Sequence, residues 1–142
     1  RPGVRRLSDI VCNQNPLTLP PSCCVKDACR MMQERRVGAV LVTDTDGRLI
    51  GIFTGRDAIN RVLALGKSAK KTKLANVMTP KPTTMSPKKT AIDALRLMWD
   101  GGFRHVPLVE EGKLVGVVAR GDFKGAEQDR LEEERQLWEH IR

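Results

Sequence analysis

Thr54 and Asp57 stand three residues apart, where the short apolar run Gly51–Phe53 meets a predicted helix. An ionised carboxylate accepts hydrogen bonds from both hydroxyls of a ribose, and such charge-assisted bonds are strong. A threonine hydroxyl donates to a phosphate oxygen, and the start of a helix turns unpaired N–H groups toward an anion. Gly55, between them, allows a ligand to approach the backbone closely. The stretch therefore has the residue types of half a ribose–phosphate site.

The same spacing has a plainer interpretation, in which Thr54 or Gly55 starts the helix and Asp57 complements its dipole. Because T-x-x-D is a very common string, spacing alone favours this helix-start interpretation. An altered copy of the stretch, Gly116–Asp122, keeps the carboxylate but has Ala119 where the hydroxyl would be. Only the first copy thus carries both groups.

Familiar catalytic and nucleotide-binding motifs are missing from the sequence. It has no G-x-x-x-x-G-K-[ST] loop, no G-x-S-x-G elbow and no H-E-x-x-H pair. The two histidines, His105 and His140, sit in different settings, and nothing favours a fold that joins Cys12 or Cys29 to His105. No acid, base and nucleophile can be named, so we expect no enzyme and no required cofactor.

Composition limits the class of protein. The 142 residues suit one domain, and the net charge of +8 favours anionic partners without choosing among them. Tyrosine is absent and the few aromatics do not interleave with basic residues, which disfavours single-strand nucleic-acid binding. No apolar run approaches the roughly 20 residues of a membrane span, and the first six residues do not resemble a signal peptide. We expect a cytoplasmic protein with no membrane partner.

The four cysteines are Cys12, Cys23, Cys24 and Cys29. Three of them crowd into seven residues and the second half of the chain has none, which is not the pattern of a disulfide scaffold. A metal site is equally disfavoured, because no C-x-x-C pair exists and no histidine lies near. We expect reduced thiols that pack as small hydrophobes.

The chain repeats itself once, in order. Each copy predicts strand, helix, strand, strand and helix. The matching segments are Leu7–Val11 with Leu74–Met78, Pro16–Leu19 with Pro82–Met85, Val25–Ala28 with Ala91–Ala94, Val37–Val42 with Phe103–Leu108, and Gly47–Gly51 with Gly112–Gly116. Thr90 and Asp93 predict a capping box, for which Cys24 is a poorer counterpart. Two copies suggest a pseudo-symmetric pair that buries a shared face.

We predict four segments from this pattern. Residues 1–66 form the first repeat, 67–73 a basic, solvated linker, 74–125 the second repeat, and 126–142 an amphipathic helix. Ile59, Val62, Leu63 and Leu65 are the apolar residues of the helix that follows Asp57. Leu131, Leu137, Trp138 and Ile141 line one face of the last helix, which we expect to dock on a second subunit rather than on its own body.

The ordered motifs resemble a tandem pair of CBS domains, named for cystathionine β-synthase and also called a Bateman module. The L-x-[DN]-[IV] openings, Phe103–Val109 and the two carboxylate stretches carry the resemblance, which covers residues 7–125. It implies an α+β fold of two pseudo-twofold-related repeats. Each would be a small three-stranded sheet with two helices, and the two would pack sheet to sheet and leave two clefts.

The resemblance also implies site residues. In the cleft headed by Asp57, this carboxylate would hold the ribose, with Thr54 near ribose or phosphate, Ile52 against adenine and Arg56 alongside. The opposite wall would be Pro82, Thr83, Gly101, Arg104 and His105. Arg104 would bind phosphate because a guanidinium is always charged and bonds in a fork. His105 would be a second phosphate donor, or alternatively a residue satisfied inside its strand.

The second cleft, headed by Asp122, departs from the family pattern. Ala119 replaces the hydroxyl, and the opposite wall offers no cation. That wall would be Leu17, Thr18, Val37, Gly38 and Ala39. We therefore expect this cleft to be weaker or empty.

Members of this family usually bind AMP, ADP, ATP, NAD or S-adenosylmethionine, form homodimers, and regulate an attached or partner protein. The resemblance thus implies a non-catalytic module that signals energy or metabolite state to an effector in trans or on a longer chain. Two alternatives remain: a structural interaction module with degenerate clefts, and, less favoured, a basic nucleic-acid-binding module.

Overall fold

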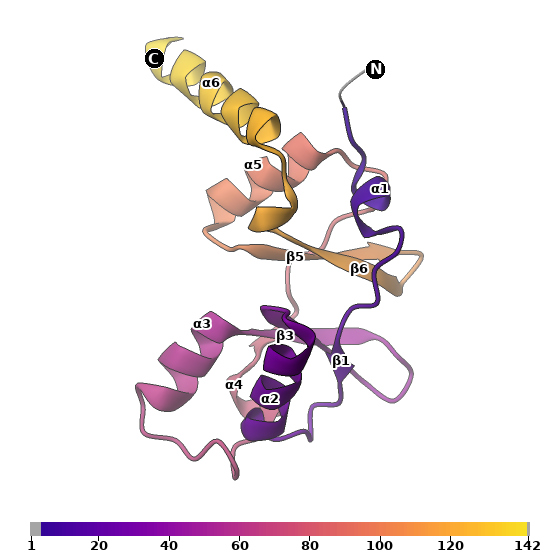
Figure 1. The fold of residues 1–142 in the computed structure, drawn as a ribbon, viewed down its shortest axis with the longest axis vertical. Coiled ribbons are helices and arrows are strands. Elements are labelled where there is room, and N and C mark those ends of the chain that lie inside the picture. Colours follow the sequence, from indigo (N-terminus) through magenta and orange to yellow (C-terminus); the bar gives the residue numbers. More distant parts are fainter. Residues whose placement is uncertain (1–3, 142) are drawn as a thin grey trace. The chain divides into compact units, whose positions relative to one another are not determined.

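The computed structural model describes residues 4–141, with side chains described through residue 139. Helices and small sheets alternate along the chain, so the predicted α+β class is confirmed (Figure 1). The first repeat supplies α1 (Leu7–Val11), β1 (Thr18–Leu19), α2 (Val25–Arg35), β2 (Ala39–Thr43), β3 (Leu49–Thr54), α3 (Gly55–Asp57) and the π-helix η1 (Ala58–Leu63). The rest supplies α4 (Leu74–Val77), β4 (Thr79–Pro80), α5 (Ala91–Gly101), β5 (His105–Glu110), β6 (Lys113–Ala119), the 3₁₀-helix η2 (Arg120–Asp122) and α6 (Gly125–Ile141).

The chain forms two compact units that do not follow the order of the repeats. Unit 1 contains the segment up to Gln14, Thr84–Glu110 and the segment from Val115 on, and unit 2 contains Asn15–Thr83 and Glu111–Leu114. The opening helix of each repeat therefore belongs to the unit built mainly from the other repeat. Helix α1 lies with α5, β5 and β6, whereas α4 lies with α2, β2 and β3.

Unit 2 is built on a four-stranded sheet in the order β1-β2-β3-β4. Strand β1 pairs parallel with β2, and the other neighbours are antiparallel. Phe53 of β3 is fully buried in a cluster with Val40 of β2 and residues of α2, η1 and α4. Side chains alternate along a strand, so Ile52 faces the opposite side of the sheet from Phe53.

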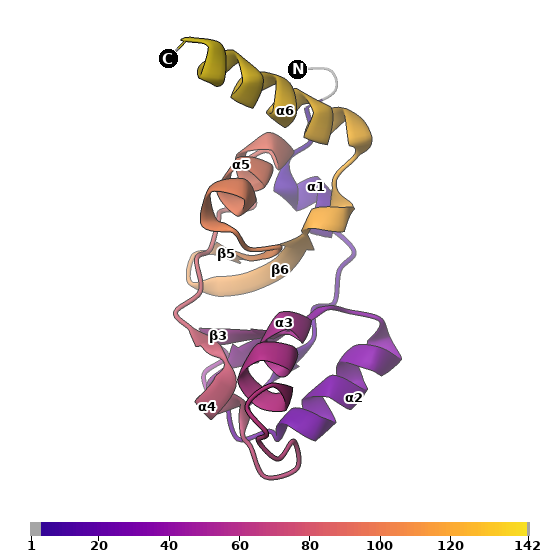
Figure 2. The same cartoon turned by 90° about the vertical axis from the view of Figure 1, so that its left-hand side faces the viewer.

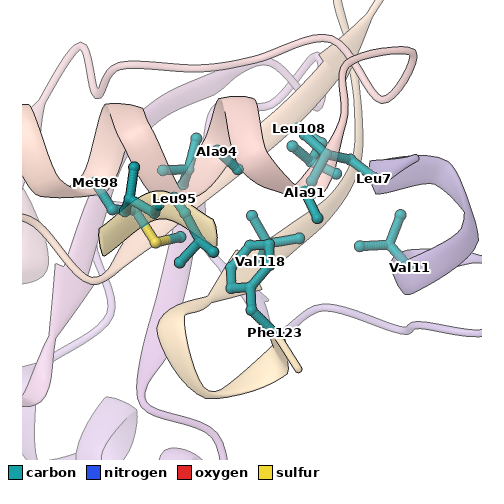
Figure 3. Close-up of a cluster of buried hydrophobic side chains, with 11 residues drawn as sticks. Leu7, Val11, Ala91, Ala94, Leu95, Met98, Leu108, Val118 and Phe123 are labelled. Carbon is teal, nitrogen blue, oxygen red and sulfur yellow. The ribbon is translucent and has the colours of Figure 1, made fainter. Parts of the chain in front are cut away.

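Unit 1 has the hairpin β5–β6, extended by an isolated parallel bridge between Met85 and Leu108. Its core joins α5 to the hairpin and to α1, whose Leu7 and Val11 lie at one end of the cluster (Figure 3). The predicted capping box at the start of α5 is present, because the Thr90 backbone N–H and hydroxyl both donate to Asp93 Oδ2 at 3.0 Å. Cys24 caps α2 without a side-chain bond, as expected of a poorer cap.

Gly51 and Gly116 occupy equivalent positions in the two repeats, and each is closely packed against the end of an opening helix. A Cβ on Gly51 would lie 2.3 Å from Met78 Sδ, and one on Gly116 would lie 2.8 Å from both Val11 Cβ and Gln14 Oε1. A thioether end can swing away, whereas a β-branched Cβ is fixed to its backbone. We predict that Gly116→Ala lowers the free energy of unfolding by about 1–3 kcal/mol. The matched Gly51→Ala change should cost clearly less in urea unfolding, and equal losses would contradict this.

The C-terminal helix corrects one prediction. Its first half docks on its own unit rather than on a second subunit, because Leu131 is buried in the unit 1 core and α6 packs across α5 (Figures 1 and 2). Arg96 Nη2 bonds Glu134 Oε2 at 2.8 Å, and the Arg135 guanidinium lies 3.7 Å from the Trp99 ring centre. Leu137 and Trp138 remain exposed. The predicted apolar role of Ile141 falls outside the described side chains.

Three smaller expectations also change. The lysine side chains of residues 67–73 are exposed as predicted, but the backbone is fixed, since Thr72 and Ala69 carbonyls accept the N–H groups of Val25 and Lys26 at 2.9 Å. Of the four apolar residues predicted for the helix after Asp57, Val62 is buried, whereas Ile59, Leu63 and Leu65 are exposed. All four cysteines are free thiols, but Cys12 is exposed rather than packed, while burial raises the pKa of Cys23 and Cys29.

Candidate functional site

The Thr54–Asp57 turn in unit 2 is closed by its own hydrogen bonds. The Thr54 backbone N–H and hydroxyl donate to Asp57 Oδ2 at 3.0 and 3.2 Å, and the hydroxyl accepts from the Asp57 N–H at 3.4 Å. Arg61 Nε lies 3.5 Å from the other carboxylate oxygen, Oδ1. Asp57 is only 9% exposed. Thr54 and Asp57 thus cap the start of α3, as the helix-start interpretation predicted.

The start of α5 provides an internal comparison. Thr90 and Asp93 have the same T-x-x-D spacing and make the same three hydrogen bonds, at 3.0, 3.0 and 3.3 Å. Neither residue was a candidate for ligand binding. Because a plain helix cap reproduces the geometry of Thr54 and Asp57, that local geometry does not by itself identify a ligand site.

Unit 2 gathers residues that the sequence had assigned to two different clefts. Ile52, Thr54, Arg56 and Asp57 lie along β3 and α3, and Pro82 and Thr83 follow β4, whose residue Thr79 pairs with Ile52. Ala39 pairs with Thr54, the Gly38 carbonyl accepts from Gly55 N–H at 3.3 Å, and Thr18 of β1 pairs with Leu41. Val37, at the approach to β2, is partly exposed. The expected wall of the Asp122 cleft thus lies beside the Asp57 turn.

Unit 1 gathers the remaining candidates, Gly101, Arg104, His105, Ala119 and Asp122. The Arg104 carbonyl accepts from the Arg120 N–H at 2.9 Å, which holds the start of β5 beside the end of β6. Asp122 is exposed, and its Oδ2 accepts from the Ala119 N–H at 2.7 Å. The carboxylate keeps the same cap position as Asp57 although the hydroxyl is missing.

The pKa of His105 depends on its burial and on two neighbouring charges. Burial lowers the pKa of His105, the Asp122 carboxylate raises it, and the Arg104 guanidinium lowers it. The structure therefore places His105 within electrostatic reach of Asp122, in the same unit as Arg104. Gly101, at the end of α5, lies against the Phe103 ring, which leaves no room for a Cβ there. The prediction that Arg104 and His105 share a cleft with Asp57 stays a prediction.

Arg5 is a neighbour of this group that sequence reasoning missed. Its Nη2 donates to the Asp122 main-chain oxygen at 3.1 Å and to Glu127 Oε1 at 2.7 Å. The Arg120–Asp122 turn is also linked to α6 through Trp99 of α5. The Trp99 ring centre lies 5.1 Å from the Arg120 guanidinium and 3.7 Å from that of Arg135 on α6. No local signal marks Arg5, because its partners are more than a hundred residues away in the sequence.

The Arg5–Glu127 pair predicts a pH dependence of stability. The hydrogen bond from Arg5 lowers the pKa of Glu127 below its ordinary 4.5, and the Thr90 backbone N–H lowers that of Asp93 below 3.8. The unfolded chain then binds these protons more readily, so the stabilisation is complete above pH 4.5 and is lost as the pH falls through the lower folded values. We expect the melting temperature of Glu127→Gln to fall less steeply between pH 5 and about pH 3 than that of wild type. Parallel curves would contradict this.

Two repeats that exchange their opening helices, each with a carboxylate at a strand-to-helix turn, define a paired-repeat module. The CBS domain family model matches residues 7–64 and 74–129. The chain belongs to the CBS-domain family, as the order of its motifs had suggested.

Relatives and solved structures agree with this assignment. The chain is 41% identical over 102 residues to the CBS domain-containing protein CBSCBSPB3 of Arabidopsis thaliana, covering 72% of this chain but only 18% of that protein. It is 35% identical to YlbB of Bacillus subtilis (strain 168), over 73% of this chain and 70% of that one. The CBS-domain protein ATU1752 of Agrobacterium tumefaciens superposes with a TM-score of 0.78 at 30% identity, covering 86% and 93% of the two chains.

One similar structure contains a ligand. The CBS domain protein PAE2072 of Pyrobaculum aerophilum, complexed with AMP, has a TM-score of 0.80 at 25% identity and covers 90% of this chain and 98% of its own. In residues 4–141 of the present chain, no helix is long and apolar enough to cross a membrane. The same described residues hold no group of three or more His, Cys, Asp or Glu side chains placed to hold a metal ion.

Proposed function

We propose that this chain is a non-catalytic regulatory module that binds an adenosine-containing nucleotide, with AMP, ADP or ATP ahead of NAD or S-adenosylmethionine. The observation that carries the proposal is the group Arg104, His105 and Asp122 at the open end of the β5–β6 hairpin. A carboxylate suits the two ribose hydroxyls, and a guanidinium with an imidazole suits phosphate. The AMP bound by PAE2072 supports the choice of ligand.

The structure changes which carboxylate we favour. The sequence pointed to Asp57 because only that copy has the hydroxyl. Asp57 is nearly buried, and its two oxygens already face Thr54 and Arg61. Asp122 is exposed, within electrostatic reach of His105 and in the same unit as Arg104. We propose Asp122 for the ribose and Arg104 and His105 for the phosphate of the stronger site, with Asp57 heading the weaker one.

Isothermal titration with AMP, ATP, NAD and S-adenosylmethionine tests the proposed function directly. Binding of one of them should also raise the melting temperature, because a ligand that binds only the folded state stabilises it by mass action. The result against the proposal is no heat and no rise in melting temperature at millimolar concentrations of any of the four.

A structural interaction module is the second candidate. It is favoured by the closed Thr54–Asp57 cap and by the exposed Leu137 and Trp138 at the end of α6. Such a module would bind no nucleotide, and its oligomeric state would not respond to one. The titration above therefore separates the two candidates.

We further expect the module to form a homodimer and to signal through it, to an effector in trans or on a longer chain. A nucleotide changes such an equilibrium only by its differential affinity for the two states. Sedimentation of the protein with and without AMP measures that difference.

A further inference from the structure

The end of α6 runs past its own docking site. One face of the helix is buried or half-buried at Glu127, Leu131, Glu134 and Arg135, at steps of three or four residues. Trp138 is the next residue on this face and is 69% exposed, and the adjacent Leu137 is 61% exposed. The face that fixes α6 to unit 1 therefore continues into an apolar tip, which no described residue covers.

This tip is acidic. Helix α6 carries six acidic side chains and two arginines, a net charge of −4 in a chain whose total is +8. Glu132, Glu133 and Glu139 are exposed around Leu137 and Trp138. We call Glu132–Glu139 the acidic tip.

An exposed apolar surface of opposite charge lies in unit 2. Ile59, Leu63 and Leu65 are 58%, 69% and 65% exposed on η1 and just after it. Residues 59–73 contain one arginine and four lysines and no acidic residue, a net charge of +5. We call this segment, 59–73, the basic face.

We propose that the acidic tip of one copy docks on the basic face of a second copy, and that two copies close by exchanging both contacts. Complementary charge selects this pairing, since tip against tip or face against face would bring like charges together. The two surfaces of one chain differ, so a single contact would leave one of each open and continue into a chain of copies. A twofold pair uses all four surfaces and repeats the contact, with the tryptophan as its anchor. This deepens the self-association proposed above.

The test uses sedimentation equilibrium of the nucleotide-free protein. Wild type should form a dimer, and Trp138→Ala and Leu63→Glu should each raise the dimer dissociation constant at least about tenfold. Val115→Ala, which trims an exposed apolar side chain outside both surfaces, should leave it unchanged. All the changed side chains are exposed, and unchanged circular dichroism will show that the variants fold.

Mixing the two variants distinguishes this pairing from any other. A Leu63→Glu chain keeps its acidic tip and a Trp138→Ala chain keeps its basic face, so the mixture should associate more tightly than either variant alone. A wild-type monomer would overturn both this docking and the homodimer. A dimer that survives Trp138→Ala, or a mixture that gains nothing, would overturn the docking and leave the homodimer standing.

Discussion

Replacing Asp122 with alanine is expected to weaken AMP binding by about 10- to 100-fold, because a hydrogen bond to a charged group contributes about 1.5–3 kcal/mol. The carboxylate is exposed and within electrostatic reach of His105, with Arg104 in the same unit. Its Oδ2 accepts from the Ala119 N–H, and the Asp122 main-chain oxygen accepts from Arg5 Nη2. The matched Asp57→Ala change should weaken binding less, since that carboxylate is occupied by its own cap and by Arg61. Isothermal titration of both variants measures the difference.

The phosphate half of the site has its own control. Arg104→Ala should weaken AMP binding by a similar factor but leave adenosine binding unchanged, because adenosine has no phosphate for the guanidinium to hold. Asp122→Ala should weaken the binding of both AMP and adenosine, since both carry the ribose. If Asp57→Ala proves the more damaging carboxylate change, the assignment made from the sequence is correct and the present one is wrong.

Local patterns predicted the elements well. The repeat, the helix start at Thr90, the hairpins and the family all follow from residue types at short spacing, where propensity, capping and alternation decide the outcome. The hairpin strands form where the matched segments predict them, but the first strand expected in the second repeat is only an isolated bridge at Met85, and β4 was not predicted. For the site, spacing pointed to the two carboxylate turns, whereas Arg104 and His105 came from the family resemblance, and the roles of all four residues stay predictions.

The grouping of these residues was beyond local patterns. The Arg104–Arg120 backbone bond joins the start of β5 to the turn that carries Asp122, which local patterns do not pair, and the cleft predicted to be shared by Arg104 and Asp57 stays a prediction. Arg5 was missed because its partners are distant in the sequence. The exposure of Leu63 was missed because helical periodicity predicts an apolar face but not what covers it. The preference for a second subunit under α6 was half wrong because two ion pairs and a cation–π contact hold its first half to its own unit.

The exchange of opening helices leads to the second large effect. Leu7 is fully buried in unit 1 although it belongs to the first repeat, and Leu74 is fully buried in unit 2 although it belongs to the second. Leu7→Ala and Leu74→Ala should each lower the free energy of unfolding by about 2–5 kcal/mol, the usual cost of emptying a core leucine site. Urea denaturation measures both losses.

Hydrogen exchange of the two variants shows where each loss is felt. Leu7→Ala should reduce amide protection in α5, β5 and β6, which share its core, and leave α2, β2 and β3 less affected. Leu74→Ala should do the reverse. Since stability is distributed over cooperative units of structure, protection should follow the spatial units and not the order of the sequence. Loss of protection in α2 and β2 on Leu7→Ala, with α5 unchanged, would mean that each repeat keeps its own opening helix.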